Sequence, residues 1–436
     1  MRGRPYYDLE AELDVARRTV RVRQRLEYPN RSGDALPDLV PAVAPNRRPG
    51  VFTLDELAMD GAPLAPGCCL DGAALRLPLP QPLPPGGQAV VTLSYTLRLP
   101  PLPAQAIGAG GALGWTLRQI NLGEWLPLAA VRKDGQWYVP PAGAVGEDAL
   151  HDAADFDLAV TLTGLPPLAE PQIIAPGTRT VGGGVHRFHL ERSRTIAWVV
   201  SSQMAVATAP AGDVPVESYF FPAHERAGQA ALRVAAAALQ QFSQLFGPYP
   251  YPSLAVVEGD FLDGMEYCGL VFVGRDYYGA YDGSAANYLT AITAHEVAHQ
   301  WWHCRVGNDP VAEPWLDEAL ATFAELLFYE AHFPQALPWW WNVRVQRFQP
   351  RGWVNRAASE FSTLRAYIDA VYLRGALMLH ELRAQMGAPA LQAAFLDYAT
   401  RYDGQIATGD ALWAILERHS SAPLDHVRAR YWRPAP

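Results

Sequence analysis

The sequence predicts a multidomain α+β protein with a β-rich N-terminal part and a mostly helical C-terminal part. Its 436 residues are too many for one ordinary core, so two or three domains are expected. Alternating apolar and polar residues dominate the first half, and segments with helical periodicity dominate from Glu225 onward. We place the boundary near residue 207, between a β-sheet domain over 1–207 and a second domain over 208–436.

Period-two patterns mark the expected strands. In VTLSYTLRL (91–99) and FDLAVTLT (156–163), apolar residues alternate with polar ones, which places one face on a core and the other in water. The arginines of RTVRVRQRLEY (18–28) could form a binding patch. However, Arg21, Arg23 and Arg25 share one parity while the apolar residues share the other, so a solvated strand face is the better interpretation.

An alanine-rich stretch predicts the first long helix. ERAGQAALRVAAAALQQFSQLFG (225–247) contains strong helix formers and ends at a glycine, just before PYPYP (248–252). A short apolar piece, SLAVVEG (253–259), reads as a strand, and helical patterns dominate after it.

Composition and charge exclude several classes of function. A net charge of −9 argues against nucleic-acid or anionic-membrane partners, which need a basic surface. No apolar run approaches the roughly 20 residues that span a bilayer. The start, MRGRPYYDLEAELD (1–14), has no apolar signal-peptide region, and the four cysteines make no disulfide framework. We therefore expect a cytoplasmic protein.

The strongest chemical signal is HEVAH (295–299), which lies in the helical stretch YLTAITAHEVAHQWW (288–302). Four residues of α-helix place His295 and His299 one above the other, about 6 Å apart, so both imidazoles can reach one zinc ion. Glu296 directly follows a ligand, so its carboxylate can reach a water at the metal and act as general base.

A third ligand is needed, and Glu318 follows His299 after eighteen residues in a second helical segment, EPWLDEALATFAELLFYE (313–330). Glu325 lies two turns further on the same face, where it can accept a hydrogen bond from a ligand histidine. The alternative is a polar stripe on an ordinary buried helix. A chance HExxH occurs in roughly one such chain in 60, and the correctly spaced glutamate lowers this to order one in a thousand. On the same helix, His303 would be too far along the axis and Cys304 would face away, so neither is expected to be a ligand.

HEVAH, the eighteen-residue spacing and WLDEALATFAE (315–325) together resemble the gluzincins, and among them the zinc aminopeptidases related to alanyl aminopeptidase. DGMEY (263–267) is similar to the family's GxMEN exopeptidase motif, and VYLRGALMLHEL (371–382) to the YxKGA helix that carries its catalytic tyrosine. The resemblance implies a saddle-like N-terminal β domain, a thermolysin-like catalytic domain and one zinc ion per chain.

The resemblance also implies roles for individual residues. Tyr372 would stabilise the oxyanion, and Glu266 would anchor the α-amine of the substrate, with Met265 also matching the motif. Gly264 would let a substrate backbone approach closely. Gln119, in LRQINLGEWLP (117–127), corresponds to a family glutamine that helps to hold the amine.

The sequence departs from the family pattern at three positions and in length. Asp263 stands for the motif's first glycine, Tyr267 for its asparagine and Arg374 for a lysine. Longer members carry a C-terminal helical domain that caps the active site. Since this chain ends at Pro436, we expect a more open cleft unless another subunit covers it.

The sequence thus predicts a zinc metalloaminopeptidase acting on peptides with a free N-terminus, without nucleic-acid or membrane partners. We expect a monomer and leave an oligomer open. One alternative is a thermolysin-type zinc endopeptidase, which would not need Glu266. Another is a scaffold that has lost its chemistry, but such a chain should lack a ligand, the base or the tyrosine, and all are present.

Overall fold

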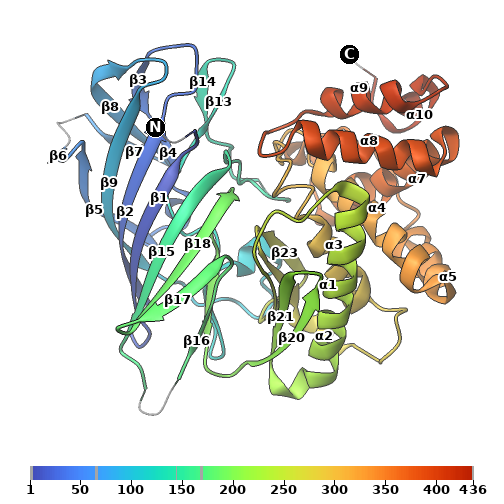
Figure 1. Cartoon of the computed structure of the whole chain (residues 1–436), viewed down its shortest axis with the longest axis horizontal. Coiled ribbons are helices and arrows are strands. Elements are labelled where there is room, and N and C mark those ends of the chain that lie inside the picture. Colours follow the sequence, from blue (N-terminus) through green and yellow to red (C-terminus); the bar gives the residue numbers. More distant parts are fainter. Residues whose placement is uncertain (1–2, 64–66, 144, 167–169, 435–436) are drawn as a thin grey trace.

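The computed structural model describes residues 3–63, 67–143, 145–166 and 170–434. A β-rich N-terminal part and a mostly helical C-terminal part lie side by side (Figure 1). The α+β fold expected from the sequence is therefore confirmed, whereas the boundary near residue 207 stays a prediction. No helix in these ranges is long and apolar enough to cross a bilayer.

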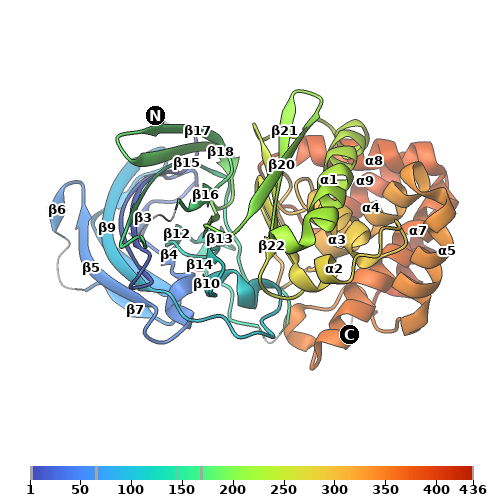
Figure 2. The ribbon, with the colours of Figure 1, turned by 90° about the horizontal axis from the view of Figure 1, so that it is seen from below.

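The largest element of the N-terminal part is an eight-stranded sheet. In order across the sheet, the strands are β17 (Thr178–Gly182), β18 (Val185–Ser193), β15 (Ala154–Thr163), β1 (Tyr6–Asp14), β2 (Thr19–Pro29), β9 (Gln88–Arg98), β5 (Phe52–Met59) and β6 (Ala62–Pro63). Buried and more exposed residues alternate along β2 and β9, as the period of two predicted. The sheet curves around the smaller sheets beside it (Figure 2), and their facing side chains share one core.

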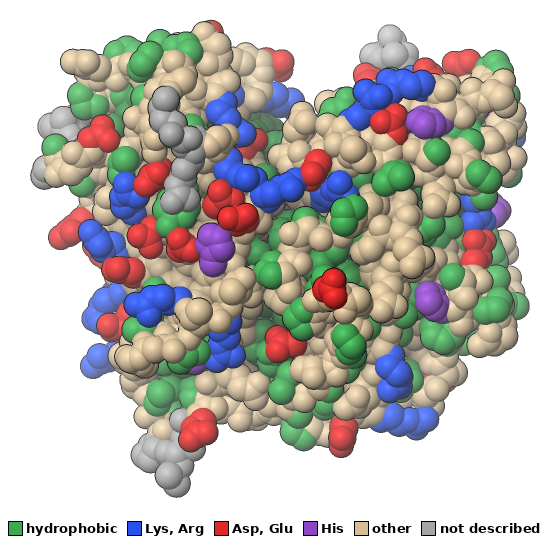
Figure 3. Space-filling model, viewed as in Figure 1, with side chains coloured by type: hydrophobic (Ala, Val, Ile, Leu, Met, Phe, Trp, Pro, Cys, Tyr) green, Lys and Arg blue, Asp and Glu red, His purple; other side chains and the backbone are tan. Residues whose placement is uncertain are grey.

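The arginines of β2 lie on the outer face of this sheet. Arg21 and Arg23 pair with Glu12 and Glu10 of β1, and all four side chains are largely exposed. Acidic and basic side chains are interspersed over this part of the molecule (Figure 3). The interpretation of the arginine cluster as a solvated strand face is confirmed.

Smaller sheets and two short 3₁₀ helices complete the N-terminal part. Their elements are β3 (Leu36–Leu39), β4 (Pro41–Ala42), β7 (Cys69–Asp71), β8 (Ala74–Leu83) and β12 (Leu128–Ala129) in one sheet, β10 (Leu113–Trp115), β11 (Ile120–Leu122), β16 (Gln172–Ile174) and β19 (Trp198–Ser201) in a second, the hairpin of β13 (Val131–Lys133) and β14 (Gln136–Tyr138), and the helices η1 (Ala44–Arg47) and η2 (Gly108–Gly111).

The C-terminal part begins with a five-stranded sheet. In order, its strands are β20 (Ala205–Ala211), β21 (Val214–Phe220), β22 (Leu254–Gly259), β24 (Leu270–Gly274) and β23 (Gly264–Tyr267). The sequence predicted β22, but β23 and β24 were not predicted because both are short and are separated by Gly269. The strand β23, which carries the GMEY motif, forms one edge of the sheet.

Helices make up most of the rest of the C-terminal part. They are α1 (Glu225–Phe246), α2 (Arg275–Gly279), α3 (Tyr288–Ala298), α4 (Trp315–His332), α5 (Leu337–Trp339), α6 (Leu364–Tyr367), α7 (Arg374–Met386), α8 (Ala388–Arg401), α9 (Gly409–His419) and α10 (Asp425–Tyr431), with the 3₁₀ helices η3 (Pro222–His224), η4 (Pro334–Ala336), η6 (Gln346–Phe348) and η7 (Ala358–Glu360) and the π-helical segments η5 (Trp340–Val345) and η8 (Ile368–Leu373). The alanine-rich helix α1 ends before Gly247, as predicted, and this glycine has a positive φ of 95°.

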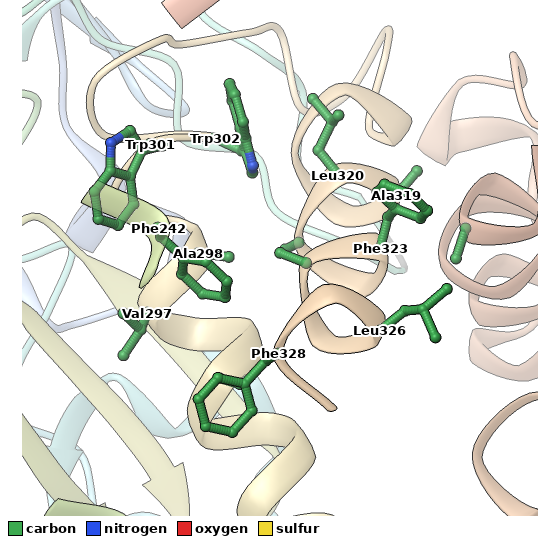
Figure 4. Close-up of a cluster of buried hydrophobic side chains, with 14 of the residues drawn as sticks. Phe242, Val297, Ala298, Trp301, Trp302, Ala319, Leu320, Phe323, Leu326 and Phe328 are labelled. Atoms are coloured by element: carbon green, nitrogen blue, oxygen red, sulfur yellow. The ribbon is translucent and has the colours of Figure 1, made fainter. Parts of the chain in front are cut away.

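The helices α3 and α4 pack against each other through a continuous apolar core. Phe242 of α1, Val297 and Ala298 of α3, and Leu320 and Phe323 of α4 belong to this core (Figure 4). Because α3 and α4 carry the predicted metal ligands, this packing fixes the ligands relative to one another.

The sequence placed residues up to Trp302 in the helix of HEVAH, and this was wrong. The helix α3 ends at Ala298, with His299 as its C-cap, and the chain then turns so that His303 has a φ of 133°. Trp301 and Trp302 are both almost fully buried, Trp301 against Phe242 and Trp302 against Phe395. The helix therefore ends before the two indoles, because their tertiary packing overrides the local helical pattern.

A further apolar cluster joins the two parts of the chain. Val199 of β19 and Ile174 of β16 belong to it together with Val257 of β22, Met265 of β23 and Phe272 of β24. One face of the C-terminal sheet is thus buried against the N-terminal part, which fixes the GMEY strand relative to both parts.

Candidate active site

The end of α3 and the first turn of α4 bring three metal-ligand side chains together. His295 and His299 are buried, with ring centroids 4.8 Å apart. Glu318 Oε2 lies 3.1 Å from His295 Nε2 and 3.5 Å from His299 Nε2. The structure therefore brings together the three ligands that the sequence predicted.

The spacing of these donors fits a single zinc ion. Donors about 2.0–2.1 Å from a tetrahedral zinc ion lie about 3.3–3.4 Å from one another. The two nitrogen–oxygen distances lie on either side of that value, and the donor atoms of His295, His299 and Glu318 are all within 4.8 Å of one another. Two imidazoles and one carboxylate are also a ligand set that suits zinc.

Each ligand histidine is held by its other ring nitrogen. His295 Nδ1 lies 3.0 Å from Glu325 Oε1, the partner that the sequence predicted. His299 Nδ1 lies 2.9 Å from the carbonyl oxygen of Trp302, a partner that the sequence could not indicate because it depends on the turn after α3. These contacts leave both Nε2 atoms free to face the common point between the donors.

Glu325 is itself held by two residues that the sequence analysis missed. Arg344 donates two hydrogen bonds to it, from Nε to Oε2 at 3.0 Å and from Nη2 to Oε1 at 2.8 Å. Trp340 Nε1 donates to Oε2 at 3.0 Å. Burial works to raise the pKa of Glu325, but Arg344 and His295 outweigh burial, so the pKa lies below its ordinary value. Glu325 is therefore an ionised acceptor for His295.

Glu296 projects from α3 into the same site. Its carboxylate is buried, and within the described residues Oε2 has no hydrogen-bond partner. Burial and the neighbouring Glu266 raise its pKa well above the usual range, while His295 and His299 act in the opposite direction. An unpartnered carboxylate oxygen beside the metal donors can accept a proton from a water molecule.

Tyr372 reaches the site from the π-helical segment η8. Its hydroxyl donates a hydrogen bond to Glu318 Oε1, and its ring stacks on His295 with a centroid distance of 5.8 Å. Single π-helical turns are frequent at functional sites. The hydroxyl therefore lies beside the metal donors.

The strand β23 supplies Glu266 and Met265. Glu266 is 5% exposed, and its Oε1 lies 3.8 Å from His299 Nδ1 and 4.0 Å from His303 Nδ1. Met265 is buried and contributes to the cavity wall. The turn after α3 places His303 near Glu266, and burial together with His299 and Arg194 lowers the pKa of His303 to about 3.

Gln119 is not brought to the site, contrary to the expectation from the sequence. Its side-chain oxygen accepts from the backbone N–H of Asp260 at 2.8 Å, and its Nε2 donates to the carbonyl of Glu258 at 3.3 Å. Both ends of the amide are thus engaged, and Gln119 is absent from the described residues that line the cavity. It links the two parts of the chain.

These residues line a cavity of about 710 Å³ between the two parts of the chain. The C-terminal part contributes the metal donors, Glu266 and Tyr372. The N-terminal part contributes Arg48, Glu124 and Glu147, which were not predicted because they come from loops far away in the sequence. A cavity of this size accommodates a short peptide segment.

Gly264 lines the cavity and lies directly beside Glu296. A Cβ at this position would lie 1.9 Å from Glu296 Oε1, so the side chain of Glu296 occupies the space that the missing Cβ leaves. We predict that Gly264→Ala displaces the Glu296 carboxylate by about 1 Å or more and lowers kcat about 100-fold, because small misplacements of reacting groups are costly.

The fold should survive this substitution, since only the end of a flexible side chain must move. Kinetics and thermal unfolding of Gly264→Ala beside Gly33→Ala, whose added Cβ would meet no atom within 4 Å, would check the prediction. Unchanged kcat in Gly264→Ala would contradict the tight packing of Glu296 on this glycine.

The C-terminal part of the chain is similar to a known protein family. Residues 230–432, which include every metal donor, match the Peptidase family M1 domain. This part of the chain is therefore similar to M1 peptidase domains. The family resemblance inferred from HEVAH, Glu318 and DGMEY is confirmed.

Relatives and solved structures of M1 proteins resemble the chain to different extents. Aminopeptidase M1-B of Oryza sativa subsp. japonica is 33% identical over 213 residues, covering 45% of this chain and 24% of that protein. The chain spans about a quarter of the length of the curated relatives that it matches.

Two crystal structures cover almost the whole chain. A mutant of a two-domain M1 zinc metallopeptidase bound to L-tryptophan has a TM-score of 0.70 and 19% identity, covering 100% of this chain and 96% of that chain. A mutant of the M1 zinc metallopeptidase from Deinococcus radiodurans, bound to the substrate Tyr-Ser-Ala, has a TM-score of 0.67 and 22% identity, covering 99% and 94%. At these identities, the likeness extends the shared fold from the M1 domain to the N-terminal β-rich part.

Proposed function

We propose that the chain is a zinc-dependent aminopeptidase that hydrolyses the first peptide bond of substrates with a free α-amine. The observation that carries this proposal is the position of Glu266, whose Oε1 is 3.8 Å from the ligand histidine His299. A carboxylate there binds the terminal ammonium, which only the first residue of a peptide offers, so the first peptide bond lies at the metal donors. The names of the M1 relatives and the tripeptide bound to the Deinococcus protein support the same class of substrate.

His295, His299 and Glu318 would hold the zinc ion, one per chain. When bound there, zinc supplies Lewis-acid activation of a water molecule and of the scissile carbonyl. Glu325, fixed by Arg344, keeps His295 oriented with Nε2 toward the site.

Glu296 acts as the general base in this proposal. Its unpartnered Oε2 accepts a proton from the attacking water and later gives it to the leaving amine. The Tyr372 hydroxyl, beside Glu318, donates a hydrogen bond to the oxyanion that develops on the carbonyl oxygen. Glu266 holds the ammonium and excludes substrates that lack it.

Paired substrates test the proposal. Amino-acid aminocoumarin amides and their N-acetylated counterparts would be compared on zinc-loaded wild type and Glu266→Ala. We expect cleavage of the free-amine substrates only, and a kcat/KM about 10- to 150-fold lower in Glu266→Ala, because one charge-assisted hydrogen bond is lost.

Each other outcome favours one alternative. Cleavage of the acetylated substrates at similar rates would indicate a thermolysin-type endopeptidase. No cleavage of any substrate by protein that binds one zinc ion would indicate a scaffold without chemistry. The cytoplasmic location and the monomeric state stay predictions from the sequence.

A further inference from the structure

We propose that Arg194, in the loop between β18 and β19 of the N-terminal part, is a positioning residue for the metal site. Its guanidinium holds the turn that follows α3, and this turn holds the ligand His299. The inference rests on the zinc site of the proposed function and goes beyond it, because it makes zinc binding depend on a residue outside the part of the chain that carries the metal donors.

The turn after α3 carries the hydrogen-bond acceptor for His299. The helix ends at Ala298, and the carbonyl oxygen of Trp302 lies 2.9 Å from His299 Nδ1. Because the peptide bond is planar, any rotation of the peptide group between Trp302 and His303 moves this oxygen. The orientation of His299 toward the metal therefore depends on the backbone conformation of residues 302 and 303.

This backbone conformation needs support from its surroundings. His303 has a φ of 133°, in a region that residues with a Cβ rarely adopt and keep only where other contacts hold them there. On one side of this residue, its N–H donates to the carbonyl oxygen of Val306 at 3.0 Å. On the other side, its carbonyl oxygen accepts from Arg194 Nε at 2.7 Å. Arg194 thus fixes the peptide group that follows the strained residue.

The other nitrogens of the guanidinium also bind backbone carbonyl groups. Nη1 donates to His151 at 2.8 Å, and Nη2 donates to Gln405 at 2.8 Å and to Arg305 at 3.4 Å. Arg194 is 5% exposed, and among the described residues no carboxylate forms an ion pair with it. A buried charge without a counter-ion must be satisfied by hydrogen bonds, so the guanidinium and these carbonyl groups fix one another.

The guanidinium lies directly against the backbone of the turn. A Cβ on Gly307 would lie 2.4 Å from Arg194 Cζ, so this glycine leaves the space that the guanidinium fills. The backbone N–H of Gly307 donates to the carbonyl oxygen of Gln405 at 2.9 Å, and this oxygen also accepts from Arg194. Arg194 therefore ties the end of the turn to the loop before α9.

A glycine at position 303 tests whether Arg194 acts through the turn. Glycine adopts a positive φ readily, so His303→Gly should keep the turn in place without Arg194. Zinc affinity would be measured by competition with a chelator for wild type, Arg194→Met, His303→Gly and the double variant. We expect Arg194→Met to bind zinc about 10- to 100-fold more weakly, His303→Gly to match wild type, and Arg194→Met/His303→Gly to regain most of the loss.

Arg275→Met provides the matched control. Arg275 also joins the two parts of the chain, through the carbonyl oxygen of Ala104 and the carboxylate of Asp260, and these contacts do not involve the turn. Its zinc affinity should equal that of wild type. If Arg194→Met does not fold, the same comparison is made with Arg194→Lys, whose single ammonium cannot reach all four carbonyl oxygens.

The possible results have different consequences. Unchanged zinc affinity in the Arg194 variant would overturn the inference. A loss that His303→Gly does not relieve, or an equal loss in Arg275→Met, would also overturn it, because Arg194 would then act through the general docking of the two parts. Wild type that binds no zinc would overturn the proposed function instead. Since no substrate is present, absence of peptide cleavage by zinc-loaded wild type would leave the inference standing.

Discussion

Replacing Glu296 by glutamine is expected to lower kcat by about 10²- to 10⁴-fold, because glutamine cannot accept the proton of the attacking water. The side chain keeps its shape, and Glu296 makes none of the contacts that define the metal donors, so zinc binding should be retained. Steady-state kinetics on a free-amine substrate, together with the zinc content of the same preparation, would measure both effects.

Glu417→Gln provides the matched control, because Glu417 is exposed on α9, far from HEVAH in the sequence and outside the cavity wall. Its kcat should equal that of wild type. A Glu296→Gln variant that keeps kcat within tenfold, with zinc bound, would mean that another group accepts the proton. Loss of zinc together with activity would mean that Glu296 supports the metal site instead.

The metal donors could be predicted because their geometry is mostly local. The i, i+4 spacing of His295 and His299 depends only on helical pitch, and His299, the C-cap of α3, keeps helical backbone angles. Glu318 and Glu325 share one face of α4 for the same reason. Only the packing of α3 against α4 had to be assumed, and the apolar residues of both segments favoured it.

Residues whose positions depend on distant segments could not be predicted. Glu147 and Arg344 reach the cavity from a loop and from the π-helical segment η5, and neither has a periodic pattern that marks its direction. The error at Gln119 has the same origin. Its alignment to a family motif was local, whereas its side chain is engaged by the backbone of residues 258 and 260 across the contact between the two parts.

Replacing Arg344 by methionine should have a large effect on stability and on metal binding at the same time. Glu325 is fully buried, and Arg344 provides two of the four hydrogen bonds that it accepts from His295, Trp340 and Arg344. Removing one partner of a buried ion pair costs about 3–5 kcal/mol, because the remaining charge is left uncompensated. Glu325 would then hold His295 less well, and weakened support of a ligand histidine typically lowers metal affinity about 10- to 100-fold.

Denaturant unfolding and zinc competition with a chelator would measure the two effects separately. The double variant Glu325→Gln/Arg344→Met removes both charges, so it should be more stable than Arg344→Met while keeping the weaker zinc affinity. Higher stability of the double variant than of Arg344→Met would show that Arg344 acts through Glu325. If Arg344 were needed only for packing, both variants would be destabilised equally. Unchanged zinc affinity in Arg344→Met would show that His295 keeps its orientation without the Arg344–Glu325 pair.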